Sequence, residues 1–551
     1  MILPRMHYQT VTTQKILSWF KSLVKPLWRR HAEVAAALIL FGPIATLAAD
    51  SQDPLLNLLL QKGILTEDEA KKVQSELEAG RTNVSQMAPM ESKWKINKAI
   101  KNIELYGDLR VRYENRQVDA PDGRIELDRG RYSVRLGLRG EAFDDIYYGV
   151  RLDTAANPRS PWVTFGTSTS GNTYQGPFGK STAGINVGQV YLGWKPTSWF
   201  DFTIGKMPQP LYTTPMVWDT DLNPEGAAER FKYTVGQADL FATFGQFYYA
   251  DENPTYSSGG LGFNGLQGQT TTPVFLLAWE AGINYRFTTN MSLKAAANLY
   301  HYVGLQTNVS PFFGDPYIGE GVFTGAGTAN PINGASGLGT SSSIPGQGSI
   351  GFPNNQVGVN HLTVLEIPVE FNFKIRSLNA RLFGDFAYNL EGKDRAEDAA
   401  SGYARWLAVQ NSISPVKVSP FSPQTQDVKA YQVGFGIGNG GNVYGPMQGL
   451  VYSSTSRKKT WEARTYWQHV EQYALDPNLI DSDYFEGRGN LEGIYVALAY
   501  SLTDNTIATF RYGYASRINE KLGNGGANQD VPQVNPIDHY NIFQVDLTFR
   551  F

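Results

Sequence analysis

The feature that most constrains this chain is a two-residue alternation of apolar and polar side chains. The last nine residues read FQVDLTFRF, and every odd position from Phe543 to Phe551 is apolar. Successive side chains of a β-strand point to opposite faces, so such a segment has one apolar and one polar face. The same pattern predicts strands at residues 103–114, 130–142, 146–154, 185–195, 200–206, 230–236, 238–248, 274–287, 291–302, 361–374, 378–390, 427–438, 459–471, 490–501, 506–515 and 540–551.

The connections between these segments alternate in length, which a soluble β-sandwich has no reason to do. Short connections lie at 143–145, 196–199, near 237, and at 288–290, 375–377 and 502–505. Long connections lie at 115–129, 155–184, 207–229, 249–273, 303–360, 391–426, 472–489 and 516–539. Outer-membrane barrels have short periplasmic turns at one end and long extracellular loops at the other. The connection 439–458 breaks the rule, so either a strand pair is misplaced there or one turn carries an insertion.

Together these patterns predict an all-β fold, a transmembrane antiparallel up-and-down β-barrel over residues 101–551, with about 16 strands and a range of roughly 14 to 18. Segments of about ten residues match a tilted crossing of the hydrocarbon core. Closure satisfies every backbone group, so no open edge meets lipid. The mature sequence has no uninterrupted apolar stretch of about 18 residues, which predicts no transmembrane helix.

Composition narrows the classes of function. Cysteine is absent, which excludes disulfides, thiolate metal sites and covalently attached c-type haem. Lys and Arg number 48 against 51 Asp and Glu, so no basic excess points to nucleic acid. We expect no cofactor held by the chain itself and no nucleic-acid partner.

The N-terminal residues 1–49 predict a secretory signal peptide. Arg29 and Arg30 precede an apolar run at 34–44, and small residues follow at 45–49. The apolar run is shorter than the roughly 20 residues that span a bilayer, which disfavours the alternative of an N-terminal membrane anchor. The protein is therefore expected to be exported.

Residues 50–100 predict a short periplasmic helical hairpin and a linker. The segment PLLNLLLQKGILTEDEAKKVQSELEAG carries an apolar stripe, and Thr66 with Glu69 forms a capping box. Two short helices cannot bury this stripe alone, so the segment requires a partner. The alternatives are packing in an oligomer, covering the pore, contact with another periplasmic component, or a simple spacer.

Several segments resemble those of a known family when they are read in order. They are LLNLLLQKGILTEDEAKKVQSELE, IELYGDLRVRYEN, FTIGKMPQP at 202–210 and the terminal TFRF. In this order they resemble the putative porin family, which is distantly similar to phosphate-selective porins. The resemblance implies a diffusion channel of the Gram-negative outer membrane, often a homotrimer. Phe549 and Phe551 resemble the C-terminal signature that outer-membrane assembly machinery recognises in such proteins.

Charges on the inward face of the predicted strands are candidates for setting ion preference. The basic ones lie on the first three strands and are Arg110, Arg112, Arg131, Arg135, Arg139 and Arg151. Adjacent strands would bring them together as a basic wall, which predicts a weak preference for anions. The alternative is that nearby acids pair with them, namely Glu104, Asp108, Glu141 and Asp153.

The third long connection, 207–229, is a candidate for narrowing the channel. Sixteen-stranded general porins fold their third external loop inward, and here that loop carries Asp219, Asp221, Glu225 and Glu229. Opposite the arginines, these acids would create a transverse field that favours polar solutes. The alternative is a loop packed at the outer rim.

The sequence offers no motif for catalysis. Neither a G-x-S-x-G elbow nor an H-E-x-x-H pair is present, and Gly436, Gly438 and Gly441 end an alternating strand instead of opening a helix. A rim site using His469 is an alternative that sequence does not address. We expect a pore for small hydrophilic solutes instead of an enzyme. Competing interpretations are a barrel that sheathes a partner such as a cytochrome complex, and a closed scaffold.

Overall fold

The computed structural model describes the residues of the predicted barrel in eleven stretches. They are 100–120, 123–142, 145–155, 160–166, 184–250, 273–304, 359, 361–400, 425–440, 457–524 and 537–551. The predicted signal peptide, 1–49, and the predicted helical segment, 50–100, lie outside these stretches except for Ile100.

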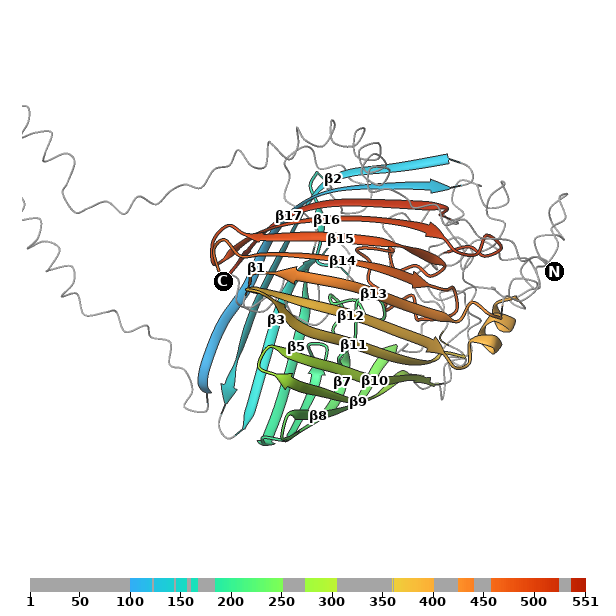
Figure 1. Ribbon diagram of the computed structural model, residues 1–551. Coiled ribbons are helices and arrows are strands. Elements are labelled where there is room, and N and C mark those ends of the chain that lie inside the picture. Colours follow the sequence, from blue (N-terminus) through green and yellow to red (C-terminus); the bar gives the residue numbers. More distant parts are fainter. Residues whose placement is uncertain are drawn as a thin grey trace, which may run out of the picture. The chain divides into compact units, whose positions relative to one another are not determined.

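The described residues form one closed antiparallel β-barrel (Figure 1). Its seventeen strands are β1 (Ile100–Ala120), β2 (Gly123–Ala142), β3 (Ile146–Ala155), β4 (Val163–Thr164), β5 (Gly184–Thr197), β6 (Phe200–Lys206), β7 (Glu225–Val235), β8 (Ala238–Ala250), β9 (Val274–Thr288), β10 (Met291–Val303), β11 (Thr363–Ile375), β12 (Leu378–Asn389), β13 (Lys429–Gly438), β14 (Trp461–Val470), β15 (Leu491–Ser501), β16 (Thr506–Arg517) and β17 (His539–Arg550). Strand β4 has two residues and only adds to the edge of β2, so the other sixteen strands make the barrel wall. The predicted fold class and strand number are confirmed.

Closure depends on the last strand pairing with the first. Strand β17 pairs with β1 from Asp108↔Arg550 to Asp119↔His539. The final residue continues this ladder, because Gly107 and Phe551 exchange both backbone hydrogen bonds, at 3.0 and 3.2 Å. The alternating C-terminus is therefore the seam of the cylinder.

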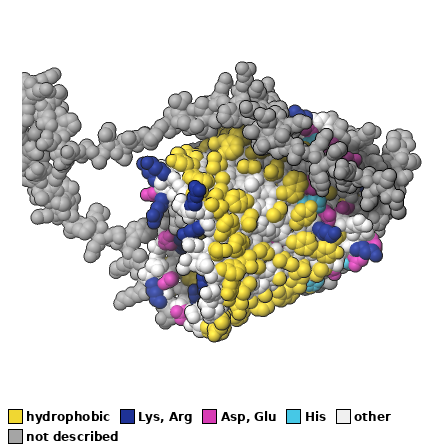
Figure 2. Space-filling view, in the orientation of Figure 1, with side chains coloured by type: hydrophobic (Ala, Val, Ile, Leu, Met, Phe, Trp, Pro, Cys, Tyr) yellow, Lys and Arg dark blue, Asp and Glu magenta, His cyan; other side chains and the backbone are white. Residues whose placement is uncertain are grey.

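The outer face is apolar, as the alternation predicts. In β15, Ile494, Val496 and Leu498 are exposed on the outside, while Tyr495 and Ala497 are buried inside. Figure 2 shows a broad band of hydrophobic side chains over the strands of this face, with charged side chains along its margins. A band of this kind suits contact with lipid hydrocarbon. In the described part of the chain, no helix has the length and apolar character needed to cross a membrane.

Aromatic side chains gather on the outer face near the short turns. Close pairs there include Trp194 with Phe200, Tyr285 with Phe287, and Phe549 with Phe551. Aromatic rings in this position match the interfacial belts of membrane barrels.

The first long connection expected from the sequence, 115–129, is mostly strand. Strand β1 continues to Ala120 and β2 begins at Gly123, with the two paired throughout. The alternation fails here because a strand above the bilayer needs no apolar face. Polar cross-strand contacts replace it, such as the hydrogen bond of 2.8 Å from Asn115 to Asp128.

Three other boundaries differ from the expectation. Strand β7 begins at Glu225 instead of residue 230, which shortens the preceding connection to 207–224. Residues 392–400 are helical within the expected loop 391–426. Strands β13 and β14 pair directly, so the anomalous connection 439–458 is an insertion in a turn and not a misplaced strand pair.

Candidate functional site

The six predicted arginines lie on β1, β2 and β3 and face the barrel interior. Each has a carboxylate within 4 Å, so they form a paired wall instead of a bare basic one. Arg110 pairs with Asp108 at 2.6 Å, Arg151 with Asp153 at 2.7 Å, and Arg139 with Glu104 at 2.7 Å. Arg131 lies 3.6 Å from Glu114, and Arg112 and Arg135 pair with acids from the connections between strands. The alternative of pairing with nearby acids describes this wall better than the expectation of a basic wall.

The connection 207–224 enters the barrel interior, and hydrogen bonds dock it on the opposite wall. The Thr213 hydroxyl donates to Glu366 of β11 at 2.7 Å, and the Thr214 hydroxyl donates to Asp385 of β12 at 2.5 Å. The side-chain amide of Asn298 on β10 donates to the carbonyl of Tyr212 at 2.8 Å. These contacts place the segment across the lumen, away from the outer rim.

A second connection, 471–490, also enters the interior and meets the first. The Asp219 amide donates to the carbonyl of Leu479 at 2.6 Å, and the Asp481 amide donates to that of Pro215 at 3.1 Å. The amide and hydroxyl of Ser482 both donate to the Asp219 carboxylate, each at 3.2 Å. We call residues 207–224 the first inward loop and residues 471–490 the second inward loop.

The second inward loop was expected only as a long external connection. A usable signal was its unusual content of apolar and aromatic residues for a loop, including Tyr473, Leu475, Tyr484 and Phe485, all buried in the structure. External loops seldom need such residues, because water surrounds them. The signal shows that the loop packs, but it does not show against what.

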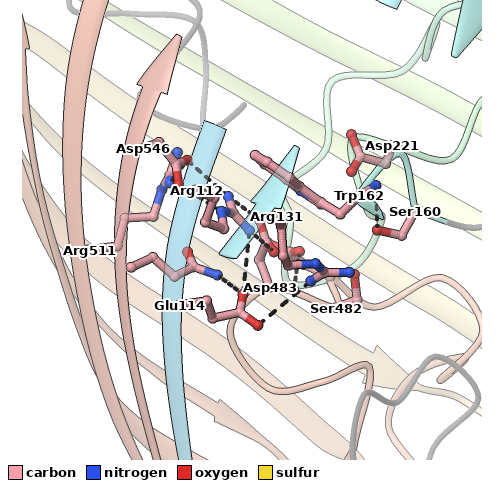
Figure 3. Close-up of polar contacts among 12 residues, drawn as sticks. Arg112, Glu114, Arg131, Ser160, Trp162, Asp221, Ser482, Asp483, Arg511 and Asp546 are labelled. Carbon is pink, nitrogen blue, oxygen red and sulfur yellow. Dashed lines mark hydrogen bonds and ion pairs between the residues drawn. The ribbon is translucent and has the colours of Figure 1, made fainter. Parts of the chain in front are cut away.

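Ion pairs tie the two inward loops to the arginine wall (Figure 3). The Arg112 guanidinium lies 2.7 Å from Asp546 of β17 and 2.9 Å from Asp483 of the second inward loop. Arg511 of β16 also pairs with Asp546, and Arg135 pairs with Asp221 of the first inward loop. Figure 3 shows Arg112, Arg511 and Asp546 of the wall together with Asp483 of the second inward loop. Buried pairs of this kind fix geometry, because removing one partner leaves a charge without compensation.

The ring of Trp162 adds an aromatic wall to this network. Residues 160–166 include β4, which pairs with β2. Trp162 is buried there, and the Cζ atom of Arg112 lies 3.9 Å from the centroid of its ring. A cation over an aromatic face is attracted by the ring quadrupole. The stacking therefore holds the Arg112 side chain in the orientation that binds both acids.

A neighbouring cluster fastens the outer part of the second inward loop. Arg116 of β1 pairs with Glu114 at 2.8 Å and with Glu486 at 3.0 Å. Arg488 pairs with Glu486 at 3.3 Å, and Arg129 pairs with Glu114 at 2.5 Å. The second inward loop is thus bound to β1 at two levels.

The acids of the two inward loops crowd one another and titrate differently. Burial, with the Asp483 carboxylate close by, raises the pKa of Asp481 to about 7. Burial and the nearby Asp481 also raise the pKa of Asp219 well above its usual range. The Arg112 guanidinium holds the pKa of Asp483 below its usual range despite burial. The junction therefore carries less negative charge at neutral pH than its carboxyl count suggests.

Glu225 and Glu229 do not belong to this junction, contrary to the expectation. Both lie in β7 on the outer face, where Glu225 pairs with Lys206 and Glu229 accepts a hydrogen bond of 3.0 Å from Gln246. The reason is the β6–β7 register: residues 225–229 pair with β6 and so belong to the strand ladder instead of the loop. Only Asp219 and Asp221 of the four expected acids lie in the first inward loop.

Phe549 and Phe551 lie on the outer face at the short-turn end of β17, and both are partly exposed. Among the described residues, no group of three or more His, Asp or Glu could hold a metal ion. His469 is hydrogen-bonded to Glu492 at 2.8 Å and stacks on Tyr431.

The closed wall, the apolar outer band and the polar, loop-narrowed interior define a β-barrel of the class that crosses a membrane with its strands. Residues 121–316 match the model of the family described as putative porin, which confirms the family resemblance over that stretch. The comparison with curated proteins finds no match.

Solved outer-membrane structures are similar at a distance. OprB of Pseudomonas putida has 10% identity and a TM-score of 0.40, covering 82% of this chain and 94% of that one. The outer membrane channel DcaP of Acinetobacter baumannii has 11% identity and a TM-score of 0.34, with 82% and 97% covered. OmpT of Vibrio cholerae has 10% identity and a TM-score of 0.34, with the same coverage. Similarity at this level carries no conclusion about solutes.

Proposed function

We propose that this protein is a passive diffusion channel for small hydrophilic solutes and ions, without enzymatic activity. The observation that carries the proposal is the meeting of the two inward loops across the lumen, tied to the wall by Arg112 and Arg135. A charged, polar junction inside a closed barrel narrows a wet passage and selects for polar solutes. The barrel wall itself supplies the passage through the hydrocarbon.

The test is planar-bilayer conductance of the refolded mature chain under a salt gradient. We expect stable ohmic steps, and the sign of the reversal potential tests the weak preference for anions. A barrel whose fold is verified by heat-dependent gel mobility but which conducts nothing would overturn the channel proposal.

The alternative role as a sheath around a partner is disfavoured by the same loops. The hydrogen bonds of Thr213 and Thr214 to Glu366 and Asp385 place chain where a sheathed partner would have to pass. Co-purification of a haem protein from cells that express the native chain would favour the sheath.

We also propose that copies of the barrel associate, as a homotrimer, through the outer face of β6 and β7. The ion pair of Lys206 with Glu225 lies on this outward side, beside the exposed Ile204. Charged groups that face lipid are costly near the bilayer centre, by about 2–4 kcal/mol for Lys. A protein neighbour would remove that cost.

Because the chain has no cysteine, single cysteines can report this contact. Ala227→Cys on β7 should crosslink copies in the membrane, and Ile494→Cys on the outer face of β15 serves as the matched control. Equal crosslinking at both positions, or none at Ala227, would contradict this interface.

Export by the signal peptide at 1–49 and recognition of Phe549 and Phe551 by the assembly machinery complete the proposal. Deleting Phe551 should lower the amount of barrel assembled in cells, while refolding in detergent stays efficient because β17 keeps its ladder with β1. Equal loss in both settings would assign the terminal ring to stability instead of recognition.

A further inference from the structure

A cavity of about 380 Å³ lies inside the barrel at the short-turn end, beneath the start of the first inward loop. Residues that line it and matter here are Lys195, Tyr212, Arg230, Lys232, Phe241 and Lys294. They come from β5, β7, β8, β10 and the first inward loop. A cavity of this size suits a small organic solute.

Three of the cations in this cavity are unpaired. Among the described residues, no carboxylate lies within 4 Å of the amino groups of Lys195, Lys232 or Lys294. The arginine wall is different, because each arginine there has an acid partner. Glu280 and Glu370 lie near enough to attract the charge of Lys294, but neither forms an ion pair with it within 4 Å.

The acids that line the cavity are already engaged elsewhere. Asp201 accepts a hydrogen bond from Tyr147 at 2.5 Å and pairs with Arg230 at 2.9 Å. Glu280 accepts the Thr243 hydroxyl at 2.7 Å and the amide of Tyr212. Two carboxylates thus face four cations, and both have their oxygens occupied.

Two aromatic rings lie beside one of these cations, Lys294. The Lys294 amino group lies 3.7 Å from the ring centroid of Tyr212 and 5.2 Å from that of Phe241. These two rings meet edge to face at 6.3 Å. The buried Tyr212 hydroxyl has no hydrogen-bond partner among the described residues, although buried hydroxyls almost always have one.

We propose that this cavity is a binding site for small carboxylates with an aromatic or apolar body. The carboxylate would meet Lys232 and Lys294, and the apolar body would pack against Phe241 and Tyr212. This inference rests on the proposed channel, because it names the solute class that the channel would hold on its way to the periplasm. The site lies on the periplasmic side of the first inward loop, so a solute reaches it after the junction.

The test uses benzoate as the probe, with acetate and benzylamine as comparisons, on single channels that conduct chloride. Benzoate should reduce the chloride current in a saturable way at concentrations about tenfold lower than acetate, because acetate lacks the ring. Benzylamine has the ring with the opposite charge and should not reduce the current. Equal effects of benzoate and acetate would reduce the site to a non-selective anion patch and overturn the proposal.

Variants locate the effect. Lys294→Gln should raise the half-blocking benzoate concentration about tenfold, since it removes the charge that would meet the carboxylate. Tyr212→Phe should raise this concentration less, because it removes a hydroxyl and no charge. Lys374→Gln is the matched control, an inward-facing lysine of β11 that does not line the cavity. Unchanged block in Lys294→Gln would overturn the proposal.

Failure of the channel proposal can be told apart from failure of this site. Binding of benzoate to the refolded barrel in detergent can be measured by saturation-transfer NMR without any current. Binding that is lost in Lys294→Gln supports the site even in a silent barrel, whereas no binding to a conducting barrel overturns the site alone.

Discussion

The guanidinium of Arg112 lies 2.9 Å from the carboxylate of Asp483, although 371 residues separate the two in the chain. Arg112 also binds Asp546, so one side chain joins the seam of the barrel to the second inward loop. The side chains of Arg112 and Asp546 are each 2% exposed, whereas that of Asp483 is 33% exposed, so the pair at the seam is the better sheltered from water. The position of the loop inside the lumen depends on this group of contacts.

Replacing Asp483 with Asn tests whether the ion pair holds the second inward loop. Asp483→Asn keeps the size of the side chain but removes its charge, while Arg112 keeps Asp546. We expect a larger and noisier single-channel conductance, because the loop loses one anchor. Asp145→Asn, in the exposed turn before β3, is the matched control and should leave conductance unchanged. A quiet channel with wild-type conductance would show that the pair does not restrain the loop.

Neutralising the arginine wall should shift ion preference towards cations. In the triple variant Arg110→Gln, Arg112→Gln, Arg135→Gln, the acids that pair with these arginines lose their partners and add negative potential to the lumen. The reversal potential in a salt gradient measures this shift. An unchanged reversal potential, with the fold intact, would refute a role for the wall in ion preference.

The junction of the two inward loops should loosen as pH rises. Burial and Asp483 raise the pKa of Asp481 to about 7, above the ordinary carboxyl value of about 3.9. The docked loop therefore holds a proton that a released loop gives up. The free energy of docking is most favourable at low pH and becomes less favourable as pH rises from about 4 to about 7. Asp219 and Asp221 face Asp481 across the junction, and Arg511 partly offsets their repulsion.

Conductance should therefore rise between about pH 4 and pH 7 and level off above pH 7. In Asp481→Asn, conductance should stay at its low-pH value across this range, because the amide cannot ionise. A profile that keeps the same midpoint in Asp481→Asn would assign the titration to another group.

A glycine on β16 tests the packing of the second inward loop on the wall. A Cβ added at Gly513 would lie 2.6 Å from Cε2 of Tyr484, which is too close for any real contact. The Tyr484 hydroxyl also donates to the carbonyl of Tyr514 at 3.0 Å, and this bond depends on the ring's position. Gly513→Ala should displace Tyr484, raise conductance and make the second inward loop more sensitive to protease.

Gly436→Ala is the matched control for this variant. Gly436 also faces inward, on β13, but the nearest atom to its added Cβ is 3.8 Å away, an ordinary contact. Equal effects of the two substitutions would point to a general loss of barrel stability instead of release of the loop.

The sequence determined the wall of this protein almost completely. Each of the sixteen expected strands has a counterpart, and the inward side of Arg110, Arg112 and Arg135 follows from the alternation. The physical reason is that each strand meets lipid on one face and the lumen on the other. The alternation within each segment therefore shows which of its side chains face the lumen. The predicted strand bounds were wrong where that environment ends. Residues 115–129 were expected to be a loop but are mostly strand, and β7 begins at Glu225 instead of residue 230.

Only the tertiary structure decided what fills the lumen. The pairing of Arg112 with Asp483, the meeting of Asp219 with Ser482, and the unpaired Lys294 beside Tyr212 join segments that are distant in the chain. A loop has no repeating environment, so its sequence does not record which wall it touches. Its place depends on side chains that many strands present together, and these become neighbours only when the barrel closes.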